Sequence, residues 1–196
     1  MERNNHNLGQ QYRPLIKIDQ SAFPRSGTNT LNIGLSLCFP NHTVNAPSYS
    51  PKTIKNGDNT FVIFRNPVDS IASWAHYSDY MCQTVTLDAL IEWWAVFAKT
   101  ALESSEKIFM TTFDLLMANH HYVFEQYAKK FNVENPQNIS KKNIDLKVKK
   151  DFPNSFPRPQ IVIPPFFYSQ ILESKKYEKA NKLYLLIKDS VNNKCC

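Results

Sequence analysis

Long apolar runs are missing from this sequence, and their absence excludes a membrane-spanning helix. Such a helix needs about 20 consecutive apolar residues. Lys99 interrupts the run WWAVFAKTAL, and Pro164 and Pro165 interrupt IVIPPFFYSQIL. The first residues, MERNNHNLGQQYRP, are polar and lack the charged start, apolar stretch and cleavage site of a secretory signal. We therefore expect no membrane span and a cytoplasmic location.

Cysteine is also sparse, and its placement argues against a metal site or a disulfide framework. The four cysteines do not have the spacing of metal ligands, and two of them end the chain; they are Cys38, Cys82, Cys195 and Cys196. We expect neither a structural disulfide nor a bound metal. Cys38 is expected in the core.

The residues that are present suit one globular domain. Of the 196 residues, 42% are hydrophobic and 13% aromatic, which is enough to bury a sizeable core, and no internal repeat occurs. We expect a polar tail over residues 1–13, a single domain over residues 14–190 and a C-terminal tail over residues 191–196. The net charge of +6 indicates an anionic partner, such as a nucleotide, a sulfated or phosphorylated small molecule, a nucleic acid or a lipid headgroup.

Strand-like and helix-like patterns alternate along the chain, which predicts an α/β fold with a mainly parallel sheet. Strands are expected over residues 15–18 and 59–64 and again up to about residue 111, and a helical pattern follows each of them. The proline-rich span 151–165 predicts an irregular covering loop. A final amphipathic helix is expected over residues 168–188, with Leu172 and Leu186 among its buried positions.

The turn FPRSGTNTL, after the first expected strand, has the composition of an anion-binding loop. In an open α/β sheet, ligands bind beyond the carboxyl ends of the strands, where helix N-termini present free N–H groups. The turn adds the hydroxyls of Ser26, Thr28 and Thr30 to the guanidinium of Arg25. Gly27 lets a ligand approach the backbone closely. The turn is not a Walker A loop, because no lysine follows this glycine.

A second turn, FVIFRNPVDSIAS, repeats the same layout of strand, polar turn and helix. Asn66 suits the N-cap position, and Pro67 suits the first helical position. Arg65 ends the strand and Ser73 follows eight residues later, about two helical turns on. These two side chains either grip a second anion or serve ordinary roles, Arg65 capping carbonyl groups and Ser73 lying on the helix surface.

Together the two turns resemble the sulfotransferase family, whose members use 3′-phosphoadenosine 5′-phosphosulfate. The segment IFMTTFDLLM, with residues 112–115 in the matching places, resembles a third element of that family. The likeness covers about residues 15–135 and implies a three-layer α/β sandwich like that of P-loop-containing nucleotide hydrolases. It assigns two sets of residues, Arg25, Ser26, Gly27, Thr28, Asn29 and Thr30 to the 5′-phosphosulfate, and Arg65 and Ser73 to the 3′-phosphate.

The resemblance also implies a mechanism. Sulfuryl transfer needs charge stabilisation at the leaving phosphate, for which Arg25 is the candidate, and it needs no metal. It also needs a base for the acceptor hydroxyl, which the family places between the first helix and the second turn. His42 is the candidate base, although a histidine in such a place is often only a loop residue. His76, Ser48 and Tyr49 are alternatives.

One family feature is missing, because no glycine follows Gly57 and the glycine-rich motif over the 3′-phosphate is therefore absent. Arg158 or the lysines between residues 141 and 150 replace it, or these lysines form a solvated face. Two other functions stay open, a small-molecule kinase and a nucleotide-binding protein without catalysis. The expected acceptor is a hydroxyl or amine of a small molecule or carbohydrate, and no nucleic-acid partner is expected. The acceptor's identity and the oligomeric state are not determined by the sequence.

Overall fold

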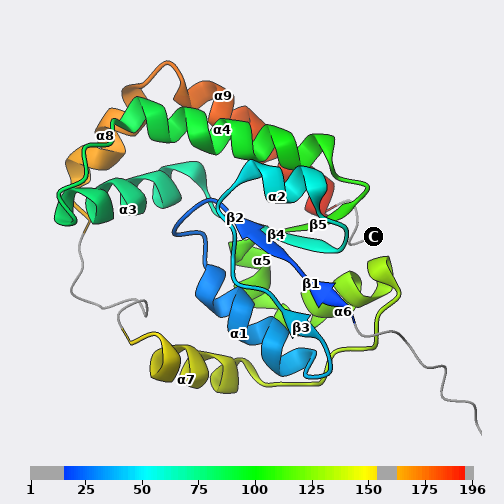
Figure 1. Ribbon diagram of the computed structural model, residues 1–196. Helices are drawn as coiled ribbons and strands as arrows, with labels where there is room; N and C mark the ends of the chain where they lie inside the picture. Colours follow the sequence, from blue (N-terminus) through cyan, green and yellow to red (C-terminus); the bar gives the residue numbers. More distant parts are fainter. Residues whose placement is uncertain (1–15, 154–162, 193–196) are drawn as a thin grey trace, which may run out of the picture.

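Helices dominate the chain, and its strands are short (Figure 1). The computed structural model describes residues 16–153 and 163–192. The strands are β1 (Lys17–Ile18), β2 (Gln20–Ala22), β3 (Thr43–Val44), β4 (Thr60–Phe64) and β5 (Ile108–Thr112). The helices are α1 (Thr28–Cys38), α2 (Pro51–Asn56), α3 (Pro67–Tyr80), α4 (Leu87–Glu103), α5 (Phe113–Ala118), α6 (His120–Phe131), α7 (Lys141–Asp151), α8 (Pro165–Glu173) and α9 (Tyr177–Asn192).

The central sheet has three parallel strands in the order β2-β4-β5. Parallel neighbours need a crossover between them, and helices α1 and α2 lie between β2 and β4 while α3 and α4 lie between β4 and β5. Strand β1 pairs with β3, and a bridge between Ser21 and Ser48 carries the chain after β3 along the edge of β2. The prediction of an α/β fold with a parallel sheet is confirmed.

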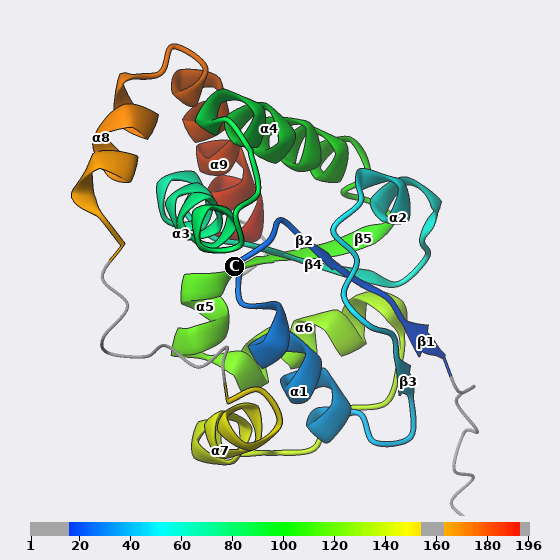
Figure 2. The same ribbon diagram turned by 60° about the vertical axis from the view of Figure 1, so that its left-hand side comes forward.

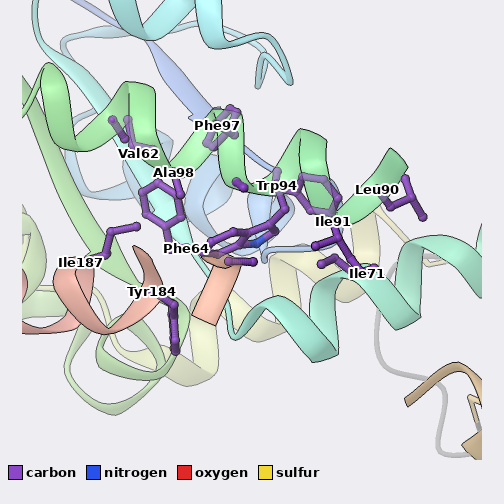
Figure 3. Close-up of a cluster of buried hydrophobic side chains, with 14 of the residues drawn as sticks. Val62, Phe64, Ile71, Leu90, Ile91, Trp94, Phe97, Ala98, Tyr184 and Ile187 are labelled. Carbon is purple, nitrogen blue, oxygen red and sulfur yellow. The ribbon is translucent and has the colours of Figure 1, made fainter. Parts of the chain in front are cut away.

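Helices pack on both faces of this sheet (Figure 2). Side chains of β4 alternate, so Phe61 and Ile63 join a cluster with α1 and α6, whereas Val62 and Phe64 join a cluster with α3, α4 and α9. Figure 3 shows the second cluster, where Phe64 lies near the α4 residues Trp94 and Phe97. The fully apolar run of β4 is explained by this burial on both sides.

The first strand lies further along the chain than the sequence predicts. Residues 17 and 18 pair only with β3, and it is β2 that joins the central sheet. The residues of β2 include Gln20, which is 1% exposed and donates its side-chain N–H groups to the Asn32 side chain and the Asn45 carbonyl. Because a buried glutamine interrupts the hydrophobic pattern, the strand predicted from the sequence ends at residue 18, before β2 begins.

The expected C-terminal helix is two helices, α8 and α9, with a break at Ser174. The Ser174 hydroxyl donates to Asp88 of α4 at 2.9 Å and accepts from the N–H of Lys176. Leu172 and Leu186, which were expected to be buried, are exposed, because their neighbours Ile171 and Ile187 take the buried positions of α8 and α9. Helix α9 continues to Asn192, two residues past the expected end of the domain, and buries Val191.

Some expected segments are only partly covered by the structure. Of the predicted loop 151–165, residue 151 ends helix α7, residue 165 begins α8, and residues 154–162 lie outside the described residues, as do the tail over residues 1–13 and residues 193–196. Over the described ranges 16–153 and 163–192, no helix has the length and apolar character needed to cross a bilayer.

Candidate functional site

The loop between β2 and α1 has an unusual backbone. Arg25 and Gly27 both have positive φ angles, 65° and 91°. Gly27 is the N-cap of α1 and provides no side-chain cap, so the first-turn N–H groups of an 11-residue helix have no side-chain acceptor at that residue. Their partial positive charge lies at the carboxyl end of β2, where an anion would be stabilised.

Gly27 is also required by the space around it. A Cβ atom built at this position would lie 2.4 Å from Cδ2 and 2.5 Å from Cε2 of Phe113, the first residue of α5. Both the left-handed backbone and the ring of Phe113 therefore exclude a side chain. The chain has only four glycines, and one of them lies where both the backbone and the neighbouring ring require it.

Two hydroxyl groups of the loop, those of Ser26 and Thr28, have few partners within the described residues. Ser26 is fully buried, and its Oγ has no hydrogen-bond partner among the residues that the structure describes. A buried hydroxyl without a partner is unfavourable, and an oxygen of a bound anion would relieve it. The Oγ1 of Thr28 lies 3.5 Å from the hydroxyl of Tyr49, an exposed residue on the edge segment beside β2.

Arg65 lies at the end of β4, next to this loop. Its Nη1 donates to the carbonyl oxygen of Arg25 at 3.5 Å, and its Cζ lies 5.5 Å from the centre of the Phe113 ring. Helix α3 then begins, with the side chain of Asn66 accepting from the N–H of Val68 at 2.9 Å as the sequence predicts. The Phe113 ring therefore contacts both turns.

Arg25 reaches the same helix. Its Nε donates to the Ser73 hydroxyl at 3.1 Å, and its Cζ lies 5.6 Å from the centre of the Tyr77 ring. The structure thus brings Arg25, Arg65 and Ser73 together. These are the two arginines of the described ranges, and among the residues described neither forms an ion pair with a carboxylate. Two guanidinium groups without an ion-pair partner at one edge of the sheet favour a bound anion.

Carboxylates also lie in the first turns of α3 and α5, the helices that follow β4 and β5. The pKa of Tyr184 in α9 is raised to about 12, mainly by burial and then by the carboxylates of Asp114 and Asp69, while Arg65 acts in the opposite direction. Asp69 follows the N-cap of α3, and Asp114 lies in the first turn of α5. Asp69 and Asp114 therefore act on the same phenol as Arg65, with the opposite sign.

The structure does not bring His42 to this cluster. His42 follows the C-terminal end of α1, and the 11 residues of that helix, about 16 Å in length, separate it from the loop. Its side chain is 2% exposed, its Nδ1 accepts from the N–H of Ile16 at 3.2 Å, and its Nε2 lies 3.8 Å from Glu134. His42 therefore stabilises the chain just before β1. Nothing in the sequence indicated that this histidine would be buried. His76 packs against Phe167.

Sequence reasoning gave no role to Phe113 or Tyr77. Phe113 could have been found because it follows β5 directly, at the same edge of the sheet as the two turns. Tyr77 could have been found because it lies four residues after Ser73 and therefore on the same face of α3. The remaining predicted loop residues, Asn29 and Thr30, lie half-buried in the first turn of α1.

The lysines between residues 141 and 150 lie on helix α7, and they are exposed. Lys147 forms an ion pair with Asp151 at 2.9 Å. The helix buries Ile144 and Val148 against Ile33 of α1, so its lysine-rich side is a solvated face. Arg158, the other candidate for the 3′-phosphate, lies outside the described residues. Within those residues no group of three or more potential metal ligands is present.

No protein-family model matches the chain, and no curated protein sequence matches it significantly.

Proposed function

We propose that this chain is a sulfotransferase that uses 3′-phosphoadenosine 5′-phosphosulfate, on a P-loop-like three-layer α/β fold. The observation that carries the proposal is the pairing of Arg25 and Arg65 at the ends of neighbouring parallel strands, linked by a hydrogen bond to the Arg25 carbonyl. A donor with anions at both ends of one nucleoside needs two cationic sites within its reach. A nucleotide with one anionic end needs only one of them.

The residues of the loop fit the donor. Gly27 allows the left-handed backbone of the loop, the hydroxyl of Ser26 lacks a partner within the described part of the chain, and the first turn of α1 offers N–H groups. Residues 25–30 would hold the 5′-phosphosulfate, and Arg65 with Ser73 would hold the 3′-phosphate. The acceptor would be a hydroxyl or amine of a small molecule or carbohydrate.

When bound, the donor supplies a sulfuryl group whose transfer leaves negative charge on a phosphate oxygen. Arg25 would stabilise this charge, since a guanidinium stays protonated and can contact two oxygens at once. The proton of the acceptor needs a base near the loop, and His42 is engaged elsewhere. Tyr49 has the nearest exposed hydroxyl to Thr28 among the contacts of the loop, and it is the group to test first.

The position of His42 favours a second candidate function, a nucleotide-binding protein without catalysis. Such a protein would keep both anion sites and lack the base. Transfer of radiolabelled sulfate from the donor to a panel of alcohols, phenols, sugars and amines separates the two functions. Transfer to any acceptor identifies the enzyme, whereas tight binding of adenosine 3′,5′-bisphosphate with no transfer to any of them favours the binder.

Thermal unfolding tests the ligand class. At about 100 times its dissociation constant, adenosine 3′,5′-bisphosphate should add roughly 2.7 kcal/mol to the free energy of unfolding, which raises the Tm by about 5 to 10 °C. ATP with magnesium should not produce this shift. Equal stabilisation by ATP would favour a kinase, and no shift with either nucleotide would reject the proposal.

Arg65→Ala tests the 3′-phosphate site. The variant should lose most of the preference for adenosine 3′,5′-bisphosphate over adenosine 5′-monophosphate, because the 3′-phosphate, which only the first ligand carries, would lose its cationic partner and keep only the Ser73 hydroxyl. Lys129→Ala, which removes an exposed charge from α6, should keep the preference. Calorimetric titration of both ligands measures it, and an unchanged preference in Arg65→Ala would reject the role.

A further inference from the structure

Helix α3 holds the side chain of Arg25 at two points. The Ser73 hydroxyl accepts from Nε at 3.1 Å, and the Tyr77 ring lies under the guanidinium with its centre 5.6 Å from Cζ. These residues are four positions apart, so they project from one face of the helix. Arg25 belongs to the preceding strand-turn-helix unit, and this contact therefore connects the two turns of the site.

The contact decides which donors of Arg25 remain for a ligand. With Nε–H engaged by Ser73, the donors of Arg25 without a hydrogen bond to any described residue are those of Nη1 and Nη2, at the tip of the side chain. Such an end-on fork matches two oxygens of a phosphate or sulfate group. Without the contact to Ser73, Arg25 could also present Nε–H and one Nη–H side by side to a ligand. Its side chain would then lose more rotamer freedom on binding.

Tyr77 acts on the face of the guanidinium and not on its edge. A cation within about 6 Å of a ring centre is attracted by the ring quadrupole. The Tyr77 ring is itself stacked on Trp74, with centroids 5.4 Å apart and planes at 27°. This stacking fixes the ring although Tyr77 is 39% exposed.

The backbone of Arg25 makes such support useful. A φ of 65° is disfavoured for a residue with a Cβ, and it fixes the direction in which the side chain leaves the loop. We propose that Ser73 and Tyr77 are positioning residues that aim Arg25 at the 5′ anion. This inference rests on the proposed function, and it assigns Ser73 to the 5′ end of the donor as well as to the 3′ end. Both roles fit one hydroxyl, since its oxygen accepts from Arg25 while its proton is free to donate to a phosphate.

Adenosine 5′-monophosphate is the probe that isolates this role, because it lacks the 3′-phosphate. Ser73→Ala should weaken its binding about three- to tenfold through loss of one hydrogen bond to a charged group. Tyr77→Leu should weaken it about two- to fivefold, while Tyr77→Phe, which keeps the ring face, should bind within about twofold of the original chain. Ser169→Ala, in α8, is the control for removing a helical hydroxyl and should have no effect.

Two results would overturn the inference while leaving the proposed function standing. If Ser73→Ala weakens binding of adenosine 3′,5′-bisphosphate but not of the monophosphate, Ser73 is a 3′-phosphate ligand only. If Tyr77→Phe loses as much affinity as Tyr77→Leu, the ring face does not act on Arg25. If the original chain binds neither nucleotide, the proposed function fails.

A measurement without ligand tests whether Ser73 holds Arg25, even if the chain binds neither nucleotide. In ¹⁵N-labelled protein, the Nε–H of Arg25 should exchange with solvent more slowly than in Ser73→Ala, because the Ser73 hydroxyl accepts from it. Equal exchange rates in the two proteins would show that Arg25 is not held and would overturn the inference by themselves.

Discussion

Gly27 shows how much the site depends on one residue that has no side chain. We predict that Gly27→Ala lowers the free energy of unfolding by about 1 to 3 kcal/mol, because φ is 91° and the added Cβ would meet Phe113. Nucleotide binding should be lost with it, since relief of the clash must move the loop or the ring that contacts Arg65. Chemical unfolding and calorimetric titration measure the two effects.

Gly34→Ala is the matched control for this change. It lies in the same helix, and its added Cβ would lie 2.7 Å from Cζ of Phe124, in the core and away from the loop. This variant should be destabilised and still bind the nucleotide. If Gly27→Ala binds as well as Gly34→Ala does, the loop is not the anion site.

His42 separates a structural role from a catalytic one. We predict that His42→Leu lowers the free energy of unfolding by about 1 to 3 kcal/mol, because the N–H of Ile16 would lose its acceptor in a partly buried place. His42→Asn should recover part of this loss, since its side-chain oxygen can take the place of Nδ1. Sulfate transfer by folded His42→Asn should stay near that of the original chain. A fall of about 10²-fold or more in kcat would restore His42 as the base.

At the scale of elements, helix α3 carries both residues that contact the side chain of Arg25. We predict that Asn66→Ala lowers the free energy of unfolding by about 1 kcal/mol through loss of the N-cap, and that it also weakens nucleotide binding because Ser73 and Tyr77 lie on the same helix. Asn119→Ala removes the equivalent cap of α6, where the side chain accepts from the N–H of Tyr122. It should lower stability by a similar amount and leave binding intact, and equal binding by the two variants would contradict the prediction.

The elements that the sequence predicts well are those specified locally. Strand β4 is a continuous apolar run, and the start of α3 is marked by Asn66 and Pro67, so both follow from neighbouring residues. Strand β2 and the break between α8 and α9 depend on distant partners, Asn32 and Asn45 for Gln20 and Asp88 for Ser174. No local pattern encodes such contacts.

The same distinction applies to the site. The loop residues and Arg65 could be named because glycine, proline and helix caps mark turns at strand ends. The contacts of Arg25 with Ser73 and Tyr77 could not be predicted, because these residues lie 48 and 52 positions further along the chain. His42 was named by its residue type and by its place between the first helix and the second turn, and only the fold reveals that its ring accepts a hydrogen bond from Ile16.

At the scale of the whole molecule, weak acids are buried on both sides of the sheet. The pKa of Cys38, in the cluster with α1, is raised from 9.0 to about 11, mainly by burial, and that of Tyr184, in the cluster with α4 and α9, from 10.0 to about 12. A raised folded-state pKa gives stability that is complete below the unfolded value and is lost as the pH rises through the folded one. We therefore predict that stability falls between about pH 9 and pH 12.

Urea unfolding across this pH range tests the prediction, and Tyr184→Phe should make the fall less steep. The matched control is Ile187→Val, one turn along the same helix, which should lower stability by about 0.5 to 1.5 kcal/mol at every pH and leave the steepness unchanged. A pH profile identical in Tyr184→Phe and the original chain would show that this phenol does not carry the effect.

The hydrogen bond from Arg65 to the backbone oxygen of Arg25 has a consequence for how the chain can diverge. A main-chain carbonyl is the same whatever residue bears it, so exchange of Arg25 for lysine leaves this link in place. Position 65 has no such freedom, because the guanidinium itself is the donor. Divergence at position 25 should therefore remove the side-chain contacts with Ser73 and Tyr77 but keep the two turns linked, whereas divergence at position 65 should cut the link itself.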